Sequence, residues 1–324
     1  MANEYTLADY EAMATDDLNK GVLHTYREVS PWMNELSFIS DPKLSQRFAR
    51  FTTLPLTHWR KIGEDFQQVN ISPDFLAERL FFFGDKVDVP VEYVKAPSIG
   101  NTRTDREQAV LKAQAYMFNE AFFIGNPATD EDQMVGLWYR LVNDFATDQS
   151  YDANALDISP DTAETNAKSK FWDVLGELLD RVDGEDNQKV LAFNRTGFMR
   201  AQSYMRDSGL LKTTQDNLGR KFTTYGENGA RLMQIGTKYD QSTQIMPDTE
   251  LADGTALTGG AKTSIFCLRF GAPYVAGWNQ DPPAAEDVGL LEARTHYRTV
   301  ISGSAGLYIT HPRAIARAYD LVIA

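Results

Sequence analysis

The chain has 324 residues, of which 43% are hydrophobic and 24% are charged, and its formal net charge at pH 7 is −13. A chain of this length and composition buries an extensive core, which excludes a molecule that is disordered or fibrous throughout. The acidic balance also excludes broad binding to nucleic acid, because a phosphate backbone is held mainly by Lys and Arg.

The N-terminal residues predict no export. Residues 1–20 carry five acidic side chains and lack a basic segment followed by an apolar core, which is unlike a secretory signal. No apolar run has the length that spans a bilayer. We therefore expect a protein that stays in the cytoplasm where it is made and does not enter a membrane.

The first 94 residues predict an arm followed by a protruding hairpin. Residues 1–50 mix short helical stretches with polar residues and show no long period, so we expect an arm there. Thr52–Arg60 is strand-like, and Val87–Tyr93 alternates with the period of two that is typical of a strand. The polar stretch between them predicts a loop, over about Thr53–Phe83, that projects from the body.

One long helix is predicted over Thr104–Ile124. Thr104 and Glu107 have the spacing of a capping box, and Gly125 then marks the end. The apolar residues that recur on one face are Val110, Leu111, Met117, Phe118, Ala121 and Phe122. About 20 residues give roughly 30 Å of helix, and we expect its polar face to be exposed while the apolar face lies across a sheet.

The second half of the chain mixes helices and strands. A helix is expected over residues 165–183, followed by a strand at Lys189–Phe193 and by a further helix for which Asn194 is the N-cap. From Gly219 onward short strands dominate, interrupted by a loop rich in Gly, Thr and Asp over Asp248–Lys262, which we expect to be a mobile surface loop. Because no regular βαβ alternation is present, the predicted fold class is α+β.

Charge is distributed unevenly in this half. Leu141–Val190 holds twelve acidic and four basic residues, a net charge of −8, whereas Arg195–Lys238 holds eight basic and three acidic residues, a net charge of +5. Two solvated faces are one interpretation. The other is that unlike patches meet between copies of the chain, because electrostatic complementarity fixes register and partner choice.

Cys267 is the only cysteine, which excludes an intrachain disulfide and the Cys-rich zinc sites. It lies in a strand-like stretch, Thr263–Phe270, where a packed core residue is favoured over a nucleophile because free Cys is among the most buried residue types.

Other chemistry-bearing patterns are weak. Gly254 and Gly259 have the spacing of a phosphate-binding loop, but Lys262 comes two places too late. The four histidines never occur at the i, i+4 spacing of a helical metal site, so neither a metal nor a cofactor is predicted. The acidic run at Asp183, Glu185 and Asp186 is interpreted as a solvated helix end. Paired carboxylates elsewhere stay open, because their separation is not written in the sequence.

Several stretches, taken in order, carry a resemblance to one protein family. They are Leu54-Pro55 with Trp59-Arg60, Asp88–Val91, Phe122–Thr129, Gly136–Arg140, Thr263–Ile265, Arg269–Gly271, Thr295–Tyr297, Gly306–Ile309 and Pro312–Arg317. In this order they resemble the major capsid proteins of tailed bacteriophages, in the branch typical of short-tailed phages. The most specific piece is Phe122–Thr129 followed by Gly136–Arg140, because coat proteins of this branch place a Gly-Asn or Gly-Asp turn and a Gly-Leu-x-x-Arg step there.

The resemblance implies the fold shared by tailed-phage coats, herpesvirus capsid floors and bacterial encapsulins. Its parts are an N-terminal arm, an extended loop, a peripheral domain with a long spine helix, and an axial domain. The expected boundaries are 1–50 for the arm, 51–94 for the extended loop and return strand, 95–140 for the peripheral domain with the spine helix, 141–290 for the axial domain, and 291–324 for a closing segment that returns to the peripheral domain.

The function that the resemblance implies is structural, not enzymatic: self-assembly into hexamers and pentamers of an icosahedral shell in the virion. The shell would enclose double-stranded DNA without sequence-specific binding. A scaffolding protein and a portal are the implied partners, and a cement protein is a further candidate. An encapsulin-like cellular shell is one alternative. An acidic hydrolase that uses paired carboxylates is another, from a different class.

The residues expected at subunit contacts lie in the extended loop. Its middle, Gly63–Asn70, is too polar to form a core of its own, so burial has to come from a neighbouring subunit. Trp59, Arg60 and Phe66 are the predicted contact residues, because aromatic side chains dominate interface energetics. The alternative for Trp59 is packing inside its own subunit.

Overall fold

The computed structural model describes residues 4–51, 54–95, 102–160, 166–215, 221–226 and 229–323. The helices are α1 Leu7–Met13, α2 Asp17–Val29, α3 Pro31–Glu35, α4 Val91–Lys95, α5 Thr102–Ile124, α6 Leu137–Asn143, α7 Ala167–Arg181 and α8 Arg195–Asp207, with short 3-10 turns at Thr147–Gln149 and Asp186–Gln188. None of the helices in these ranges is long and apolar enough to cross a membrane.

The strands form two large sheets and one small ladder. Their bounds are β1 Glu4–Tyr5, β2 Phe38–Ser40, β3 Ser45–Arg50, β4 Asp74–Arg79, β5 Phe81–Pro90, β6 Ser150–Asp157, β7 Lys189–Phe193, β8 Leu211–Gln215, β9 Lys221–Tyr225, β10 Arg231–Gln234, β11 Thr263–Arg269, β12 Val275–Asn279, β13 Ala284–Leu290, β14 His296–Ile309 and β15 Ile315–Val322. The mixture of helices and strands confirms the predicted α+β class.

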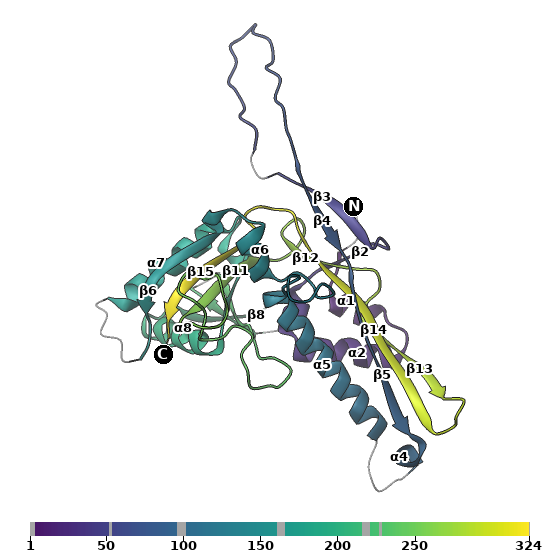
Figure 1. Ribbon diagram of the computed structural model, residues 1–324. Helices are drawn as coiled ribbons and strands as arrows, with labels where there is room; N and C mark the ends of the chain where they lie inside the picture. Colours follow the sequence, from purple (N-terminus) through teal and green to yellow (C-terminus); the bar gives the residue numbers. More distant parts are fainter. Residues whose placement is uncertain are drawn as a thin grey trace.

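The six-stranded sheet carries the long helix. Its order is β1-β2-β12-β14-β13, with β5 also paired to β14. β5 and β14 run antiparallel from His296 opposite Pro90 to Ala305 opposite Phe81. α5 lies alongside these two strands and packs against α2 (Figure 1). The predicted continuation of the strand through Val91–Tyr93 is wrong, because these residues form the short helix α4.

α5 is one uninterrupted helix of 23 residues, as predicted. Leu111, Phe118 and Phe122 are buried and Lys112 is exposed, but the polar residues Gln114 and Asn119 are buried as well, so the polar face is exposed only in part. The expected capping box is wrong: the helix begins two residues earlier, at Thr102. Glu107 instead accepts a hydrogen bond from the Arg103 guanidinium at 3.0 Å, within the helix.

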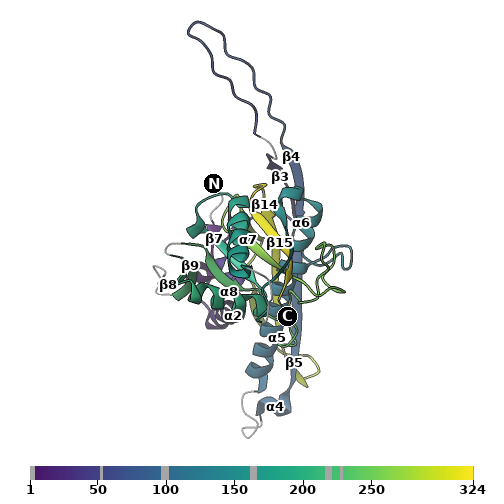
Figure 2. The same cartoon turned by 90° about the vertical axis from the view of Figure 1, so that its left-hand side faces the viewer.

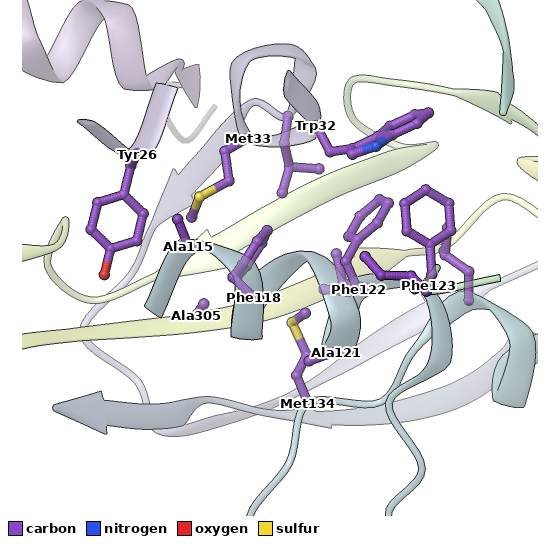
Figure 3. Close-up of a cluster of buried hydrophobic side chains, with 14 of the residues drawn as sticks. Tyr26, Trp32, Met33, Ala115, Phe118, Ala121, Phe122, Phe123, Met134 and Ala305 are labelled. Atoms are coloured by element: carbon purple, nitrogen blue, oxygen red, sulfur yellow. The ribbon is translucent and has the colours of Figure 1, made fainter. Parts of the chain in front are cut away.

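The N-terminal segment that the sequence predicted as an arm is folded onto α5. Tyr26, Trp32 and Met33 are almost completely buried, and they lie over α5 (Figure 3). The Trp32 ring meets the Phe123 ring edge-on with centroids 4.9 Å apart, and the Tyr26 hydroxyl donates to the Gln114 side chain at 2.7 Å. Helices of 5–13 residues each bury one short stripe, so no long period marked this segment in the sequence.

The seven-stranded sheet, of order β6-β15-β11-β7-β10-β9-β8, separates two cores. Leu191 and Phe193 of β7 point toward α7 and α8, which cover one face (Figure 2). Val190 and Ala192 point to the other face, where they join the core of α5. The strand Lys189–Phe193 and the N-cap Asn194, whose side chain accepts from the Gly197 N–H, are confirmed. The predicted helix over 165–183 is observed as α7 Ala167–Arg181; residue 165 lies outside the described residues.

Cys267 is fully buried in β11, which confirms the predicted core position. Burial raises the pKa of its thiol to about 12, so the reactive thiolate is scarce near pH 8. We expect Ellman's reagent at pH 8 to leave the folded protein unmodified and to titrate one thiol per chain in denaturant. Rapid reaction without denaturant would contradict the core assignment.

Candidate subunit interface

The hairpin β3–β4 ends in a long loop, residues 54–73 in the described range, that projects away from the rest of the molecule (Figures 1 and 2). The hairpin is six residue pairs long, from Ser45 opposite Arg79 to Arg50 opposite Asp74. The projecting loop confirms the predicted protrusion. The strand expected at Thr52–Arg60 is wrong over its described part, since residues 54–60 contain no strand; Thr52 and Thr53 lie outside the described residues.

The loop exposes apolar side chains that its own subunit does not cover. Trp59 is 104% exposed and Phe66 81% exposed, so Trp59 does not pack inside its own subunit. The other exposed apolar residues of the loop are Leu54, Leu56, Ile62, Val69 and Ile71. A set of this size is unusual on a monomer and is typical of an interaction surface.

Local contacts shape the tip of the loop. The Glu64 N–H donates to the Lys61 carbonyl at 3.2 Å, and the Lys61 N–H donates to the Glu64 carboxylate at 3.0 Å. Gly63, between them, has φ +88°, a backbone conformation that favours glycine. The Arg60 guanidinium donates to the Glu64 carbonyl at 2.8 Å and lies 4.3 Å from the centre of the Phe66 ring. Arg60 and Phe66, two of the predicted contact residues, therefore stiffen the tip as a pair.

A buried ion pair anchors the base of the loop to the body. Both nitrogens at the end of Arg140, on α6, contact the two carboxylate oxygens of Glu78, on β4, and the Nη2–Oε2 distance is 2.7 Å. The two side chains are only 3% and 6% exposed. Such a two-point contact fixes geometry as well as charge, so it sets the direction in which β4, and with it the loop, leaves the body.

Close backbone packing explains the two glycines of the motif formed by Phe122–Thr129 and Gly136–Arg140. Gly125, after α5, and Gly136, before α6, lie back to back, with the Gly136 N–H donating to the Gly125 carbonyl at 2.9 Å. A Cβ at Gly125 would lie 2.0 Å from the Met134 carbonyl oxygen, and a Cβ at Gly136 would lie 2.4 Å from the Gly125 nitrogen. The close turn places Arg140 under β4. Sequence reasoning found this motif but missed its partner Glu78.

A second buried ion pair holds the loop over Asp248–Lys262. The Arg317 guanidinium, on β15, lies 3.3 Å from the carboxylate of Glu250 and donates to the Gly254 carbonyl at 3.0 Å. Burial raises the pKa of Glu250, and burial also lowers that of Arg317. Gly254 belongs to the incomplete phosphate-binding pattern of the sequence, and in the structure it lies against Arg317.

The three acidic residues interpreted as a solvated helix end, Asp183, Glu185 and Asp186, differ in their exposure to solvent. Glu185 and Asp186 are exposed, whereas Asp183 is 44% exposed at its side chain and accepts a hydrogen bond from the Tyr274 hydroxyl at 2.7 Å. That hydrogen bond holds the pKa of Asp183 below its usual value. Within the described residues, no group of three or more His, Cys, Asp or Glu side chains lies close enough to hold a metal ion.

The two oppositely charged segments contain the two edge strands of the seven-stranded sheet, and their helices α7 and α8 meet between these edges through the Lys168–Asp207 ion pair. The acidic segment contains the edge strand β6, the 3-10 turn before it and α7, where the exposed acids are Asp148, Asp152, Asp173, Glu177 and Asp180. The basic segment contains the opposite edge strand β8 with β9 and α8, where the exposed bases are Arg195, Arg206, Lys212 and Lys221. A subunit with unlike charges at its two edges suits head-to-tail contacts with copies of itself.

No known family profile matches the sequence, and no curated protein matches it. The structure is similar to the capsid of the native GTA particle, with a TM-score of 0.57 and 11% identity over 92% of this chain and 90% of that one. It is also similar to the holo-SrpI encapsulin of Synechococcus elongatus, with a TM-score of 0.54 and 16% identity over 100% of this chain and 98% of the encapsulin.

A third similar structure is the capsid of the cyanophage P-SCSP1u, with a TM-score of 0.52 and 13% identity over 89% of this chain and 86% of that one. The three likenesses define a fold class. The chain has the fold shared by phage capsid proteins and encapsulins, which confirms the fold that the sequence resemblance predicted.

Proposed function

We propose that the chain is the major capsid protein of a tailed bacteriophage, which self-assembles into hexamers and pentamers of an icosahedral shell and is not an enzyme. The observation that carries the proposal is the projecting loop. Its exposed apolar residues, Trp59 above all, have no core to join in their own subunit. Aromatic anchors of this kind are typical of protein interfaces.

The similarity of the fold to phage capsids supports the same conclusion. In this proposal the shell encloses double-stranded DNA in the virion, a scaffolding protein and a portal act with it, and a cement protein is a further candidate partner. The domains have the boundaries expected from the sequence with three exceptions: α2 and α3 pack onto α5 instead of forming a free arm, β12 and β13 lie in the sheet that carries α5, and β15 lies in the seven-stranded sheet. The protein is made in the cytoplasm of the bacterial host. The net charge of −13 fits a shell that encloses DNA without gripping it.

One specific observation favours a second candidate, an encapsulin-like shell: the likeness to the encapsulin of Synechococcus elongatus covers the whole chain. The genes beside the coding sequence separate the two functions. Terminase and portal genes are expected for the phage protein, and a gene for an enclosed enzyme is expected for the encapsulin.

Sedimentation velocity over a range of protein concentrations tests self-assembly itself. We expect large species whose share grows with concentration, because each copy both offers a loop and accepts one. A small discrete oligomer at every concentration would instead indicate an enzyme-like protein and would contradict the proposal.

The charged edges predict that contacts between copies weaken with salt. At 1 M salt the Debye length is about 3 Å, so the attraction between the acidic and basic edges is screened. We expect Arg206→Glu with Lys212→Glu to reduce assembly at low salt to about the level that the wild type shows at 1 M salt. The control is Lys112→Glu, an exposed position on α5 away from both edges. Equal assembly of all variants at low and high salt would contradict this prediction.

A further inference from the structure

We propose that a small pocket at the base of the β3–β4 hairpin binds an alkylammonium group, the cationic end of a small aliphatic amine or of a Lys side chain. The pocket lies between β2, β3, β12 and β14. The residues that line it are Ile39, Asp41, Gln46, Phe48, Trp278 and Tyr308. The inference does not rest on the proposed function, because the pocket belongs to the single chain.

One wall of the pocket is a face of the six-stranded sheet. Trp278, on β12, lies opposite Gly306 on the antiparallel strand β14. Because successive side chains alternate between the two faces of a sheet, Tyr308 lies on the same face as Trp278. Ile39 is the partner of Trp278 on its other side, on the parallel strand β2. The sheet therefore offers an indole and a phenol ring on one face.

The hairpin supplies the opposite wall. The Phe48 ring, on β3, lies 4.3 Å from the Tyr308 ring and 6.0 Å from the Trp278 ring between centroids, with interplanar angles of 76° and 89°. Figure 1 shows β3 close to β2 and β12. Trp278 is buried, and Phe48 and Tyr308 are half-buried, so all three rings are held in place by packing.

The pocket has the size of a small group. Its volume is about 240 Å³, below the range of about 300–1,000 Å³ that holds drug-sized ligands. A water molecule takes up about 30 Å³ of the liquid, so the pocket has the volume of about eight waters. An ammonium group with a short alkyl chain needs no more room than this.

The electrostatic character of the pocket favours a cation. Among the lining residues, Asp41 carries the only charge at pH 7, and none is Lys or Arg. The face of an aromatic ring is negative and attracts a cation that lies within about 6 Å of the ring centre. A carboxylate beside three rings therefore selects a ligand that combines positive charge with apolar groups.

Asp41 has only a weak partner in its own chain. The Lys43 ammonium lies 3.4 Å from the carboxylate, and the Lys43 N–H donates to it at 3.1 Å. The Lys43 side chain is 60% exposed, and an exposed ion pair of this kind adds little to stability. A ligand cation can therefore displace the Lys43 ammonium from Asp41.

Butylammonium is the probe for this site, because it has the chain length and charge of a Lys side chain. 1-Butanol has the same carbon chain without the charge and is the neutral control. Saturation-transfer NMR in phosphate buffer at pH 7 and low salt reads binding on the probe, so it serves for single subunits and for large particles. We expect saturable binding of butylammonium to the subunit, and binding of 1-butanol that is at least about tenfold weaker.

Substitutions locate the site. Phe48→Leu and, separately, Asp41→Asn should each weaken butylammonium binding at least about fivefold, whereas Lys43→Ala should strengthen it by removing the competing cation. Asp41→Asn keeps the shape of a partly exposed side chain, so the test does not depend on how Phe48→Leu folds. Phe75→Leu is the matched control: Phe75 is 63% exposed and lies on the other face of the hairpin, so its replacement should leave the affinity unchanged.

Assembled particles separate the two sources of the ammonium group. Binding to subunits and particles alike identifies a free amine as the ligand. Binding to subunits alone identifies a Lys side chain of a neighbouring copy, which then fills the pocket in the particle. If the wild type forms no particles, the proposed function fails while the binding result stands.

Three results would overturn the inference. They are the absence of saturable butylammonium binding to the subunit, equal binding of 1-butanol, and unchanged affinity in both Phe48→Leu and Asp41→Asn. The second of these would make the pocket a general apolar cavity, and the third would place the binding elsewhere on the chain.

Discussion

Replacing Glu78 by Ala is expected to lower the free energy of unfolding by about 3–5 kcal/mol, the cost of leaving a buried charge without its partner. The Arg140 guanidinium is only 3% exposed and would keep just one weak contact, to the Val135 carbonyl at 3.3 Å. Urea unfolding followed by circular dichroism measures the change. A loss below about 1 kcal/mol would contradict the account of the loop base.

Two controls show whether the effect comes from the unpaired charge. Removing both partners, with Glu78→Leu and Arg140→Met, should cost much less than Glu78→Ala, since replacing a buried pair by apolar residues is often neutral or stabilising. The pair Lys168–Asp207 is a matched exposed pair, with side chains 49% and 54% exposed. Asp207→Ala should change stability by less than about 1 kcal/mol.

The second large effect is expected on assembly, from replacing Trp59 and Phe66 together by Ala. Truncating one well-packed aromatic anchor typically costs about 2 kcal/mol or more, which weakens each subunit contact about 30-fold. The isolated subunit should keep its melting temperature, because both rings are exposed and belong to neither core. Sedimentation velocity and differential scanning calorimetry measure the two properties on the same samples.

Tyr239→Ala is the matched control for this prediction. Tyr239 is an aromatic residue outside the loop and is 71% exposed, so its replacement tests whether any exposed ring matters for assembly. Unfolded or aggregated Trp59→Ala, Phe66→Ala protein would mean that the rings belong to the subunit's own core. Folded variant protein that assembles like the wild type would remove the loop from the interface.

Features that depend on neighbouring residues in the sequence were predicted well. The helix α5 and the strand Lys189–Phe193 follow from local sequence patterns and the N-cap at Asn194 from capping chemistry, and the structure has all three, although α5 begins two residues before its predicted start. Cys267 was placed in the core because it lies in a strand-like stretch and free Cys is among the most buried residue types, and the structure buries it fully. These signals come from residues that are close in the sequence, and contacts with distant residues did not change the secondary structure that they favour.

Features that depend on distant partners were missed or misplaced. Thr52–Arg60 has the composition of a strand, but its described residues, 54–60, pair with no strand in the part of the chain that the structure describes. The hairpin forms on either side of the loop instead, between β3 and β4. Val91–Tyr93 alternates like a strand. However, the pairing of β5 with β14 ends at Pro90, and these residues form the start of α4.

The candidate interface was predicted in part. Trp59, Arg60 and Phe66 were named because a polar loop cannot cover its own aromatic residues, and the structure exposes the loop; their contact with a neighbour remains a prediction. The pairing of Glu78 with Arg140 could not be found in this way. The two residues are 62 positions apart in the chain, and this spacing has no recognisable period.

Cryo-electron microscopy of particles formed by the purified chain tests the central claim most directly. The account predicts closed shells, rings or tubes of repeated subunits in which each extended loop lies on an adjacent copy, with Trp59 buried against that neighbour. Single subunits or small compact oligomers at every concentration, with the loop facing solvent, would contradict it.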